Sequence, residues 1–320
     1  MNAFERASLY GVMPVIAVPD PTYAKPLGDA LCAGGIPQIE VLMRNEAALE
    51  SLRIMKAECP DMMVGAGTVL TLEQLKAAIE AGADFIVTPG FNPAIVEYAL
   101  ERNVPILPGC VTASEVERGM SYGMNTFKFF PSEKMGGLGT IKELCGPYKG
   151  IKFVPTSGLT LDNMSSYLAY EGVAAVGGSF VAPKAILEAR EFATITALCQ
   201  RAMQNSLGFT LAHVGVNGAN EEEGVAIAKR FAAIFGLPTK DGSKSMFAGT
   251  MVEASKGTLP GTHGHIGVGT LSVKRAMQYL ESRGLEFRED YRSYDKAGNL
   301  MAAYITEEVG GFAVHVVKRA

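Results

Sequence analysis

The chain has 320 residues, more than one average domain and about right for two. Hydrophobic residues make up 48% and charged residues 19% of it, as in a globular protein with a large core. The net charge of −4, with both signs mixed along the chain, argues against a protein that binds nucleic acid through its charge. No run of about 18 apolar residues is present, so we expect no membrane-spanning helix, and the first residues lack the layout of a secretory signal.

Cysteine and histidine are distributed differently. The five cysteines are widely spaced and form no Cys-x-x-Cys motif, which favours reduced thiols in the cytoplasm over a disulfide framework. The four histidines all follow residue 212. This segregation indicates two parts with different chemistry.

The first part alternates short apolar runs with amphipathic helical stretches, such as Leu72–Ala81 and Ala113–Tyr122. Eight strands are predicted, at Val12–Val18, Gln38–Met43, Met63–Val69, Phe85–Pro89, Val104–Gly109, Thr126–Pro131, Lys152–Thr156 and Val173–Gly177. Eight strand–helix repeats in about 200 residues predict an α/β fold, the (β/α)₈ TIM barrel. A doubly wound open sheet is the alternative, and no Gly-x-Gly-x-x-Gly follows the first strand to support it.

The pattern changes at Asn205-Ser206-Leu207-Gly208, which we take as a helix stop and hinge. The predicted domains are therefore residues 1–207 and 208–320. In the second, a strand, a helix and further strands occur twice, as a weak repeat about 55 residues long. The elements are Phe209–Val216, Glu221–Phe235, Ser245–Ala248 and Thr250–Ala254, then His265–Leu271, Val273–Arg283, Phe287–Tyr294, Met301–Thr306 and Phe312–Val317. We predict a smaller α+β domain of paired βαβββ modules.

Lys128 interrupts the apolar strand Phe127-Lys128-Phe129-Phe130. Alternation places Phe127 and Phe129 on one face of the strand and Lys128 on the other. A lysine facing the helices would be buried among apolar side chains, so the barrel lumen is the favoured position. An ammonium there is poorly solvated, which favours the free amine, a nucleophile for a ketone. A surface lysine is the alternative.

Other polar residues fall at matching places in the strands. Glu40 and Arg44 share a face of the second strand, and Thr68 ends the third. A carboxylate near an amine can shuttle protons, although a structural salt bridge is the alternative. Arg44 can bind a carboxylate through two parallel hydrogen bonds.

Two turns that contain glycine follow the seventh and eighth strands. They are Thr156-Ser157-Gly158 and Gly177-Gly178-Ser179. Loops at these positions of a barrel often bind phosphate through backbone N–H groups.

Residues 1 to about 205 resemble a known family. Phe127-Lys128-Phe129-Phe130-Pro131-Ser132-Glu133 is similar to the Lys-Phe-Phe-Pro-Ala-Glu signature of the bacterial 2-keto-3-deoxy-6-phosphogluconate / 4-hydroxy-2-oxoglutarate aldolases. Further matches are Ile39-Glu40-Val41-Leu42-Met43-Arg44, Gly65-Ala66-Gly67-Thr68-Val69, Thr88-Pro89-Gly90 and Pro108-Gly109. The resemblance implies a homotrimer of (β/α)₈ barrels that needs no metal or other cofactor.

The same resemblance implies a role for each matched residue. Lys128 would form a Schiff base with a 2-keto acid, and Glu40 would act as acid and base. Arg44 and Thr68 would hold the pyruvyl carboxylate. The substrate's distal phosphate would lie against residues of the two turns: Thr156, Ser157, Gly158, Gly178 and Ser179.

One position departs from the family pattern. Ser157 stands where the family usually has the first glycine of Thr-Gly-Gly. If this position requires a positive φ, the serine costs about 1 kcal/mol; otherwise the turn differs. Either outcome bears on phosphate binding and so on the choice of substrate.

In the second domain, strands carry His213, His265 and His315, and Glu253 closes the first module. Two modules related by a pseudo-twofold axis would bring these four residues together in one cup. This set suits Zn²⁺, Ni²⁺, Fe²⁺ or Mn²⁺. The pattern across residues 209 to 318 resembles the glyoxalase / vicinal oxygen chelate superfamily, in which metal ligands occupy these positions. A metal-free assembly module is the alternative.

We therefore predict a Schiff-base aldolase that cleaves a small 2-keto acid to pyruvate and an aldehyde. One alternative is a metal-dependent isomerase or lyase run by the second domain. Another is a non-catalytic sugar-acid sensor, which would have no need of an amine in the lumen.

Overall fold

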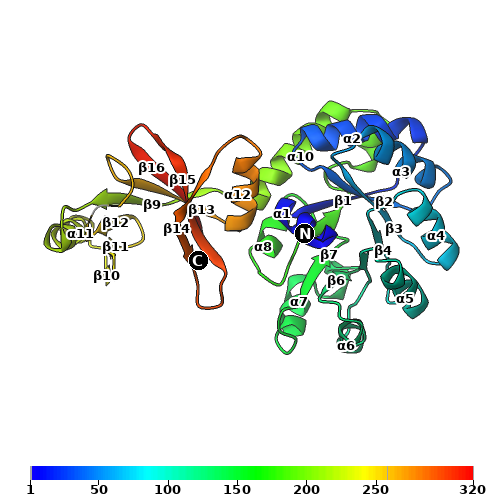
Figure 1. Ribbon diagram of the computed structural model, residues 1–320, viewed down its shortest axis with the longest axis horizontal. Helices are drawn as coiled ribbons and strands as arrows, with labels where there is room; N and C mark the ends of the chain where they lie inside the picture. The colour runs from blue at the N-terminus through cyan, green and yellow to red at the C-terminus, as the bar shows by residue number, and fades with distance from the viewer. Residues whose placement is uncertain (1, 258, 320) are drawn as a thin grey trace. The chain divides into compact units, whose positions relative to one another are not determined.

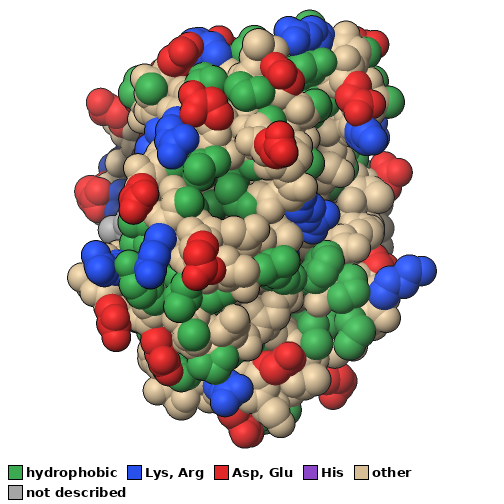
Figure 2. Space-filling model, turned by 90° about the vertical axis from the view of Figure 1, so that its right-hand side faces the viewer, with side chains coloured by type: hydrophobic (Ala, Val, Ile, Leu, Met, Phe, Trp, Pro, Cys, Tyr) green, Lys and Arg blue, Asp and Glu red, His purple; other side chains and the backbone are tan. Residues whose placement is uncertain are grey.

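The computed structural model describes residues 2–257 and 259–319. The chain divides into two compact units, Met1–Ser206 and Leu207–Ala320 (Figure 1). Within the described residues, no helix combines the length and the apolar character that crossing a membrane requires. On the face drawn in Figure 2, Lys and Arg side chains are interspersed with Asp and Glu, as they are along the sequence.

Eight parallel strands form the sheets of the first unit. Six of them pair in the order β5-β4-β3-β2-β1-β8: β1 (Val12–Ile16), β2 (Gln38–Leu42), β3 (Met63–Gly67), β4 (Phe85–Val87), β5 (Ile106–Leu107) and β8 (Val176–Gly178). The other two, β6 (Thr126–Phe129) and β7 (Lys152–Pro155), form a separate pair. Isolated parallel bridges lie between these sheets, at Gly109↔Lys128, Phe153↔Val173 and Thr156↔Gly177.

All eight predicted strands are present, but over residues 2–206 they do not form the continuous eight-stranded ladder of a TIM barrel. The observed form is a curled sheet of six strands beside a pair. The break next to β5 has a local cause, because Pro105 and Pro108 flank this strand of two residues and proline lacks the N–H that a ladder needs.

Except for α1, which precedes the first strand and packs against the inner cluster described below, the helices follow strands and lie around the outside of the sheet (Figure 1). They are α1 (Ala3–Tyr10), α2 (Ala24–Ala33), α3 (Ala47–Glu58), α4 (Leu72–Glu80), α5 (Pro93–Glu101), α6 (Ala113–Ser121), α7 (Gly137–Cys145), α8 (Met164–Leu168), α9 (Lys184–Glu188) and α10 (Phe192–Leu207), with 3₁₀ turns η1 (Pro21–Tyr23) and η2 (Glu133–Met135). The predicted helix starts are confirmed. The Thr71 hydroxyl accepts a hydrogen bond of 3.2 Å from the backbone N–H of Gln74. Thr112 forms a capping box with Glu115.

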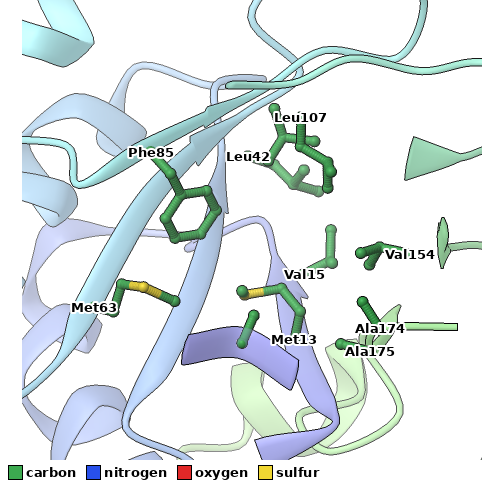
Figure 3. Close-up of a cluster of buried hydrophobic side chains, with 11 residues drawn as sticks. Met13, Val15, Leu42, Met63, Phe85, Leu107, Val154, Ala174 and Ala175 are labelled. Atoms are coloured by element: carbon green, nitrogen blue, oxygen red, sulfur yellow. The ribbon is translucent and has the colours of Figure 1, made fainter. Parts of the chain in front are cut away.

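Inward-facing side chains of the curled sheet form an apolar cluster (Figure 3). It contains Met13, Val15, Leu42, Met63, Phe85, Val87, Leu107, Val154, Ala174 and Ala175. Ala7 of α1 is buried in the same cluster, and Phe4 packs against it. Gly65 makes room for the ring of Phe85, because a Cβ at this glycine would lie 2.2 Å from its Cε2.

The second unit contains one mixed sheet of eight strands, in the order β10-β11-β12-β9-β13-β16-β15-β14. The strands are β9 (Thr210–Asn217), β10 (Thr239–Asp241), β11 (Ser245–Ala248), β12 (Val252–Ser255), β13 (His265–Thr270), β14 (Phe287–Tyr294), β15 (Leu300–Val309) and β16 (Phe312–Lys318). The two halves are arranged alike: β9 and β13 pair antiparallel at the centre, β12 runs parallel to β9, and β16 runs parallel to β13.

Each half has the order strand, helix and three strands. In the first half α11 (Glu221–Phe235) packs on β11 and β12, and Ala228 is buried against Met246. In the second, α12 (Val273–Glu281) packs on β15 and β16. Strand β10 was not predicted, because its three residues, Thr-Lys-Asp, are all exposed and carry no apolar pattern.

Candidate functional site

A buried ion pair lies on the inner face of the curled sheet. Lys128 of β6 places its Nζ 3.0 Å from Oε1 of Glu40 on β2, and the two side chains are 6% and 3% exposed. Phe127 and Phe129 point to the other side and contact the ring of Phe153, as the alternation predicted. An isolated charge in such a place would be strongly disfavoured, so each group depends on its partner.

Glycine on the neighbouring strand makes room for this carboxylate. A Cβ at Gly67 would lie 2.1 Å from Oε1 of Glu40. On β3, Gly65 thus leaves space for the ring of Phe85, and Gly67 leaves space for the carboxylate of Glu40.

Arg44 and Thr68 meet just beyond β2 and β3. Nε of Arg44 donates a hydrogen bond of 3.0 Å to the Thr68 hydroxyl. Thr68 has a φ of 58°, which is uncommon for a β-branched residue. No other hydrogen bond of the guanidinium forms among residues 2–257 and 259–319, so its remaining N–H groups can bind a carboxylate.

The two predicted glycine turns lie side by side. Thr156 and Gly177 form a parallel bridge, and a Cβ at Gly177 would lie 2.4 Å from Oγ1 of Thr156. Ser157 has a φ of 82° and Gly158 a φ of 83°. Of the two outcomes expected for the serine, the structure therefore has the positive φ.

A cavity of about 390 Å³ opens beside the second turn. Its lining includes Ser179 after β8, Val15 of β1, and Leu42 and Asn45 at the end of β2. Arg44, Thr68 and both turns follow the carboxyl ends of parallel strands, and these ends meet at one edge of such a sheet. An amine, a carboxylate, a guanidinium and backbone turns are suited to a small anionic carbonyl compound.

The second unit brings its strand-borne histidines together. The three candidate ligand nitrogens of His213, His265 and His315 lie within 4.8 Å of one another. Nε2 of His213 lies 3.0 Å from Nε2 of His315 and 3.1 Å from Oε2 of Glu253. That oxygen is also 3.4 Å from Nε2 of His265. The four predicted ligands therefore form one cluster, whereas His263 bonds to the Gly310 carbonyl instead.

Two glycines face these imidazoles across the central strands. Gly267 pairs with His213, and Gly215 pairs with His265. A Cβ would lie 2.0 Å from Cε1 of His265 if placed at Gly215, and 2.5 Å from Cε1 of His213 if placed at Gly267. Sequence reasoning missed both glycines, although the repeated His-x-Gly pattern in β9 and β13 is a signal for them.

Further side chains surround the cluster. Ser245 donates a hydrogen bond of 2.6 Å to Oε1 of Glu253, which leaves Oε2 toward the histidines. Tyr304 stacks on His315 with ring centroids 4.4 Å apart. The pKa of His315 is lowered to about 3, mainly because the imidazole is buried and secondly because His213 lies close to it. Burial by itself would raise the pKa of the Glu253 carboxyl. Hydrogen bonds, of which the one from His213 has the largest effect, outweigh burial and lower this pKa.

Comparison with known proteins relates the first unit to a family of enzymes. Residues 5–198 match the family described as KDPG and KHG aldolase. The 2-dehydro-3-deoxy-phosphogluconate aldolase of Treponema pallidum is 42% identical over 204 residues, which cover 64% of this chain and 97% of that protein. The KHG/KDPG aldolase of Escherichia coli K12 is 40% identical over 195 residues, covering 61% and 92%.

Solved structures agree with this relation. The 2-keto-3-deoxy-6-phospho-gluconate aldolase of Zymomonas mobilis is 38% identical, with a TM-score of 0.61 and coverage of 63% of this chain and 97% of that one. The KDPG aldolase of Legionella pneumophila, with pyruvate captured as a covalent carbinolamine, is 35% identical with a TM-score of 0.60, covering 62% and 97%. The family match ends at residue 198, before the second unit begins.

The buried pair generates a prediction about stability. Lys128→Met alone leaves the Glu40 carboxylate buried without its partner, so it should lower the free energy of unfolding by about 3–5 kcal/mol. Adding Glu40→Gln removes the unpaired charge and should restore a large part of that loss. Urea titrations followed by circular dichroism compare the proteins. A double variant less stable than Lys128→Met would contradict the interdependence of the two groups.

Proposed function

The chain belongs to the KDPG and KHG aldolase family, whose match spans residues 5–198, and we propose that its aldol cleavage to pyruvate proceeds through a Schiff base on Lys128. The observation that carries this proposal is the buried contact of 3.0 Å between Lys128 and Glu40. The proposed substrates are a 2-keto-3-deoxy-6-phospho sugar acid and 4-hydroxy-2-oxoglutarate. Their aldehyde products are glyceraldehyde 3-phosphate and glyoxylate.

The reaction begins when the Lys128 ammonium passes a proton to the Glu40 carboxylate, and the free amine then attacks the C2 ketone. Glu40 returns the proton to the hydroxyl of the carbinolamine, which leaves as water and gives an iminium that can accept an electron pair. Glu40 takes the proton of the C4 hydroxyl, the C3–C4 bond breaks, and its electrons enter the iminium to give an enamine. The aldehyde leaves. Protonation at C3 and addition of water then release pyruvate and restore the amine.

The remaining groups bind and orient the substrate. Arg44, fixed by its hydrogen bond to Thr68, would hold the pyruvyl carboxylate through its free N–H groups. The distal phosphate would bind at the paired turns, through Thr156, Ser157, Gly158, Gly178 and Ser179. The covalent carbinolamine captured with pyruvate in the Legionella pneumophila aldolase supports attack by an amine in this family.

Three broader assignments accompany this proposal. They concern the fold of the first unit, the assembly and the cellular compartment. We assign the eight parallel strands of the first unit to a (β/α)₈ barrel, in which the isolated bridges next to β5 and β8 complete the ring. The proposed assembly is a homotrimer. The five widely spaced cysteines suit reduced thiols in the cytoplasm.

The second unit is proposed to bind one divalent metal through His213, Glu253, His265 and His315. Two donor atoms at about 2.1 Å from a metal lie about 3.0 Å apart at a right angle and about 3.4 Å apart at a tetrahedral angle. The three separations given above, 3.0, 3.1 and 3.4 Å, fall in this range. Three imidazoles and one carboxylate suit Zn²⁺, Ni²⁺, Fe²⁺ or Mn²⁺.

A metal bound there would supply Lewis acidity. We name no reaction for this unit, and no observation favours an isomerase run by it. A sensor function for the first unit is disfavoured, because a buried amine paired with a carboxylate has a use in catalysis and none in holding a ligand.

The Schiff base predicts a covalent adduct. Borohydride added with pyruvate should attach one pyruvate-derived group to Lys128, and mass spectrometry of peptides should locate it. Lys152→Ala, which removes an exposed lysine at the start of the neighbouring strand β7, is the matched control and should still be labelled. Labelling that persists in Lys128→Ala would disprove the assignment.

Glu40 predicts a different kinetic effect. Glu40→Gln keeps the size of the side chain but cannot accept the C4 hydroxyl proton, so turnover should fall by about 10²–10⁴-fold. The borohydride adduct with pyruvate should still form, because its formation breaks no C3–C4 bond. Steady-state assays of pyruvate release measure the fall in turnover. Near-normal turnover would remove Glu40 from the mechanism.

The metal proposal is tested by elemental analysis of the purified full chain. After reconstitution, the wild type should contain about one metal per chain, because the three imidazole nitrogens lie within 4.8 Å of one another and the Glu253 carboxylate lies beside two of them. The variant His263→Ala should contain as much, because His263 lies outside the cluster. The double variant His213→Ala/His265→Ala should contain little. EDTA should leave pyruvate release intact, because the iminium accepts the electrons. Near-zero metal in every protein would identify the second unit as an assembly module.

A further inference from the structure

Ser157 has a backbone conformation that residues with a side chain rarely adopt. Its φ is 82°, in the region where glycine alone is unhindered by a Cβ. Among the described residues, three other non-glycine residues have a positive φ: Thr68, Asn103 and Arg190. Such strain tends to persist where the surroundings or the function require it.

The other three strained residues have local explanations. The hydroxyl of Thr68 accepts a hydrogen bond of 3.0 Å from Arg44. The guanidinium of Arg190 lies 4.1 Å from the centre of the Tyr23 ring. Asparagine, as at Asn103, tolerates the left-handed region better than most residues.

The Ser157 side chain has no such explanation. It is exposed, and in the described part of the chain its hydroxyl forms no hydrogen bond. Glycine would relieve the strain without loss of any hydrogen bond of this side chain within the described residues. The hydroxyl is therefore available to a ligand, and a ligand is what would account for its presence.

The turn is also held so that it cannot relax alone. The N–H of Glu133 donates to the Ser157 carbonyl at 3.3 Å, and Nδ2 of Asn163 donates to the Gly158 carbonyl at 3.0 Å. The side chain of Glu133 closes one side, since a Cβ at Gly158 would lie 2.4 Å from its Cγ. Rotation of the serine out of positive φ would disrupt these contacts.

We propose that the Ser157 hydroxyl determines specificity by donating a hydrogen bond to the phosphate at the far end of the substrate. The turn follows β7, and the Thr156↔Gly177 bridge joins it to the second glycine turn. This inference rests on the proposed function, in which both turns bind the distal phosphate. A side-chain donor adds to the backbone N–H groups that such turns already offer.

Two substitutions separate the hydroxyl from the strain. Ser157→Ala keeps the Cβ and removes the hydroxyl, whereas Ser157→Gly removes both. A hydrogen bond to a charged group changes an equilibrium by about 10- to 100-fold. Both variants should therefore reduce, by that factor, the ratio of kcat/KM for 2-keto-3-deoxy-6-phosphogluconate to kcat/KM for 4-hydroxy-2-oxoglutarate. Ser157→Gly should melt at a higher temperature than Ser157→Ala.

The matched control is Asn103→Gly, which relieves a positive φ of 55° at the amino end of β5. This variant should keep the wild-type ratio of the two kcat/KM values, because Asn103 lies away from the carboxyl ends of the strands. Borohydride trapping with pyruvate is measured first in every protein, to verify folding and an intact amine.

The outcomes distinguish the two proposals. A wild type that traps no pyruvate would overturn the proposed function itself. A wild type that traps pyruvate but does not prefer the phosphorylated substrate would overturn the phosphate assignment, and the role of Ser157 with it. A wild-type preference that survives in both Ser157 variants would overturn the role of the hydroxyl alone.

Discussion

The buried contact between Lys128 and Glu40 is the constraint on which the first unit depends. Two opposite charges lie 3.0 Å apart where neither side chain is more than 6% exposed, so neither is tolerable without the other. The space for the carboxylate exists because Gly67 has no Cβ. The apolar cluster around Phe85 occupies the rest of the inner face (Figure 3). The Lys128 side chain, the proposed nucleophile, is thus held by packing on regular strands, which fixes its position.

The groups proposed to bind the substrate are placed differently from this pair. Arg44, Thr68 and Ser157 lie just beyond strand ends, and two of the three have a positive φ. Loops at the carboxyl ends of parallel strands are where such folds vary their ligands. In the proposed mechanism, the strands carry the catalytic pair and the turns carry the groups that select the distal part of the substrate.

The histidine cluster of the second unit draws on both halves of a repeated arrangement. Strands β9 and β13 lie antiparallel at the centre of the sheet, and each contributes a histidine followed two residues later by a glycine. The pairing sets each imidazole opposite the glycine of the other strand, where a Cβ would collide with it. One half alone could not form the proposed metal site, because His213 and Glu253 come from the first half and His265 and His315 from the second.

The sequence by itself determined the eight strands of the first unit, the bounds of the four predicted helices to within two residues, the inward direction of Lys128 and the repeated order of the second unit, because apolar periodicity and N-caps are local signals. It could not determine that Gly67 makes room for Glu40 or that Gly215 faces His265. Nor could it choose between a positive φ and a different turn at Ser157. These features depend on distances between segments far apart in the chain, which only the tertiary structure fixes.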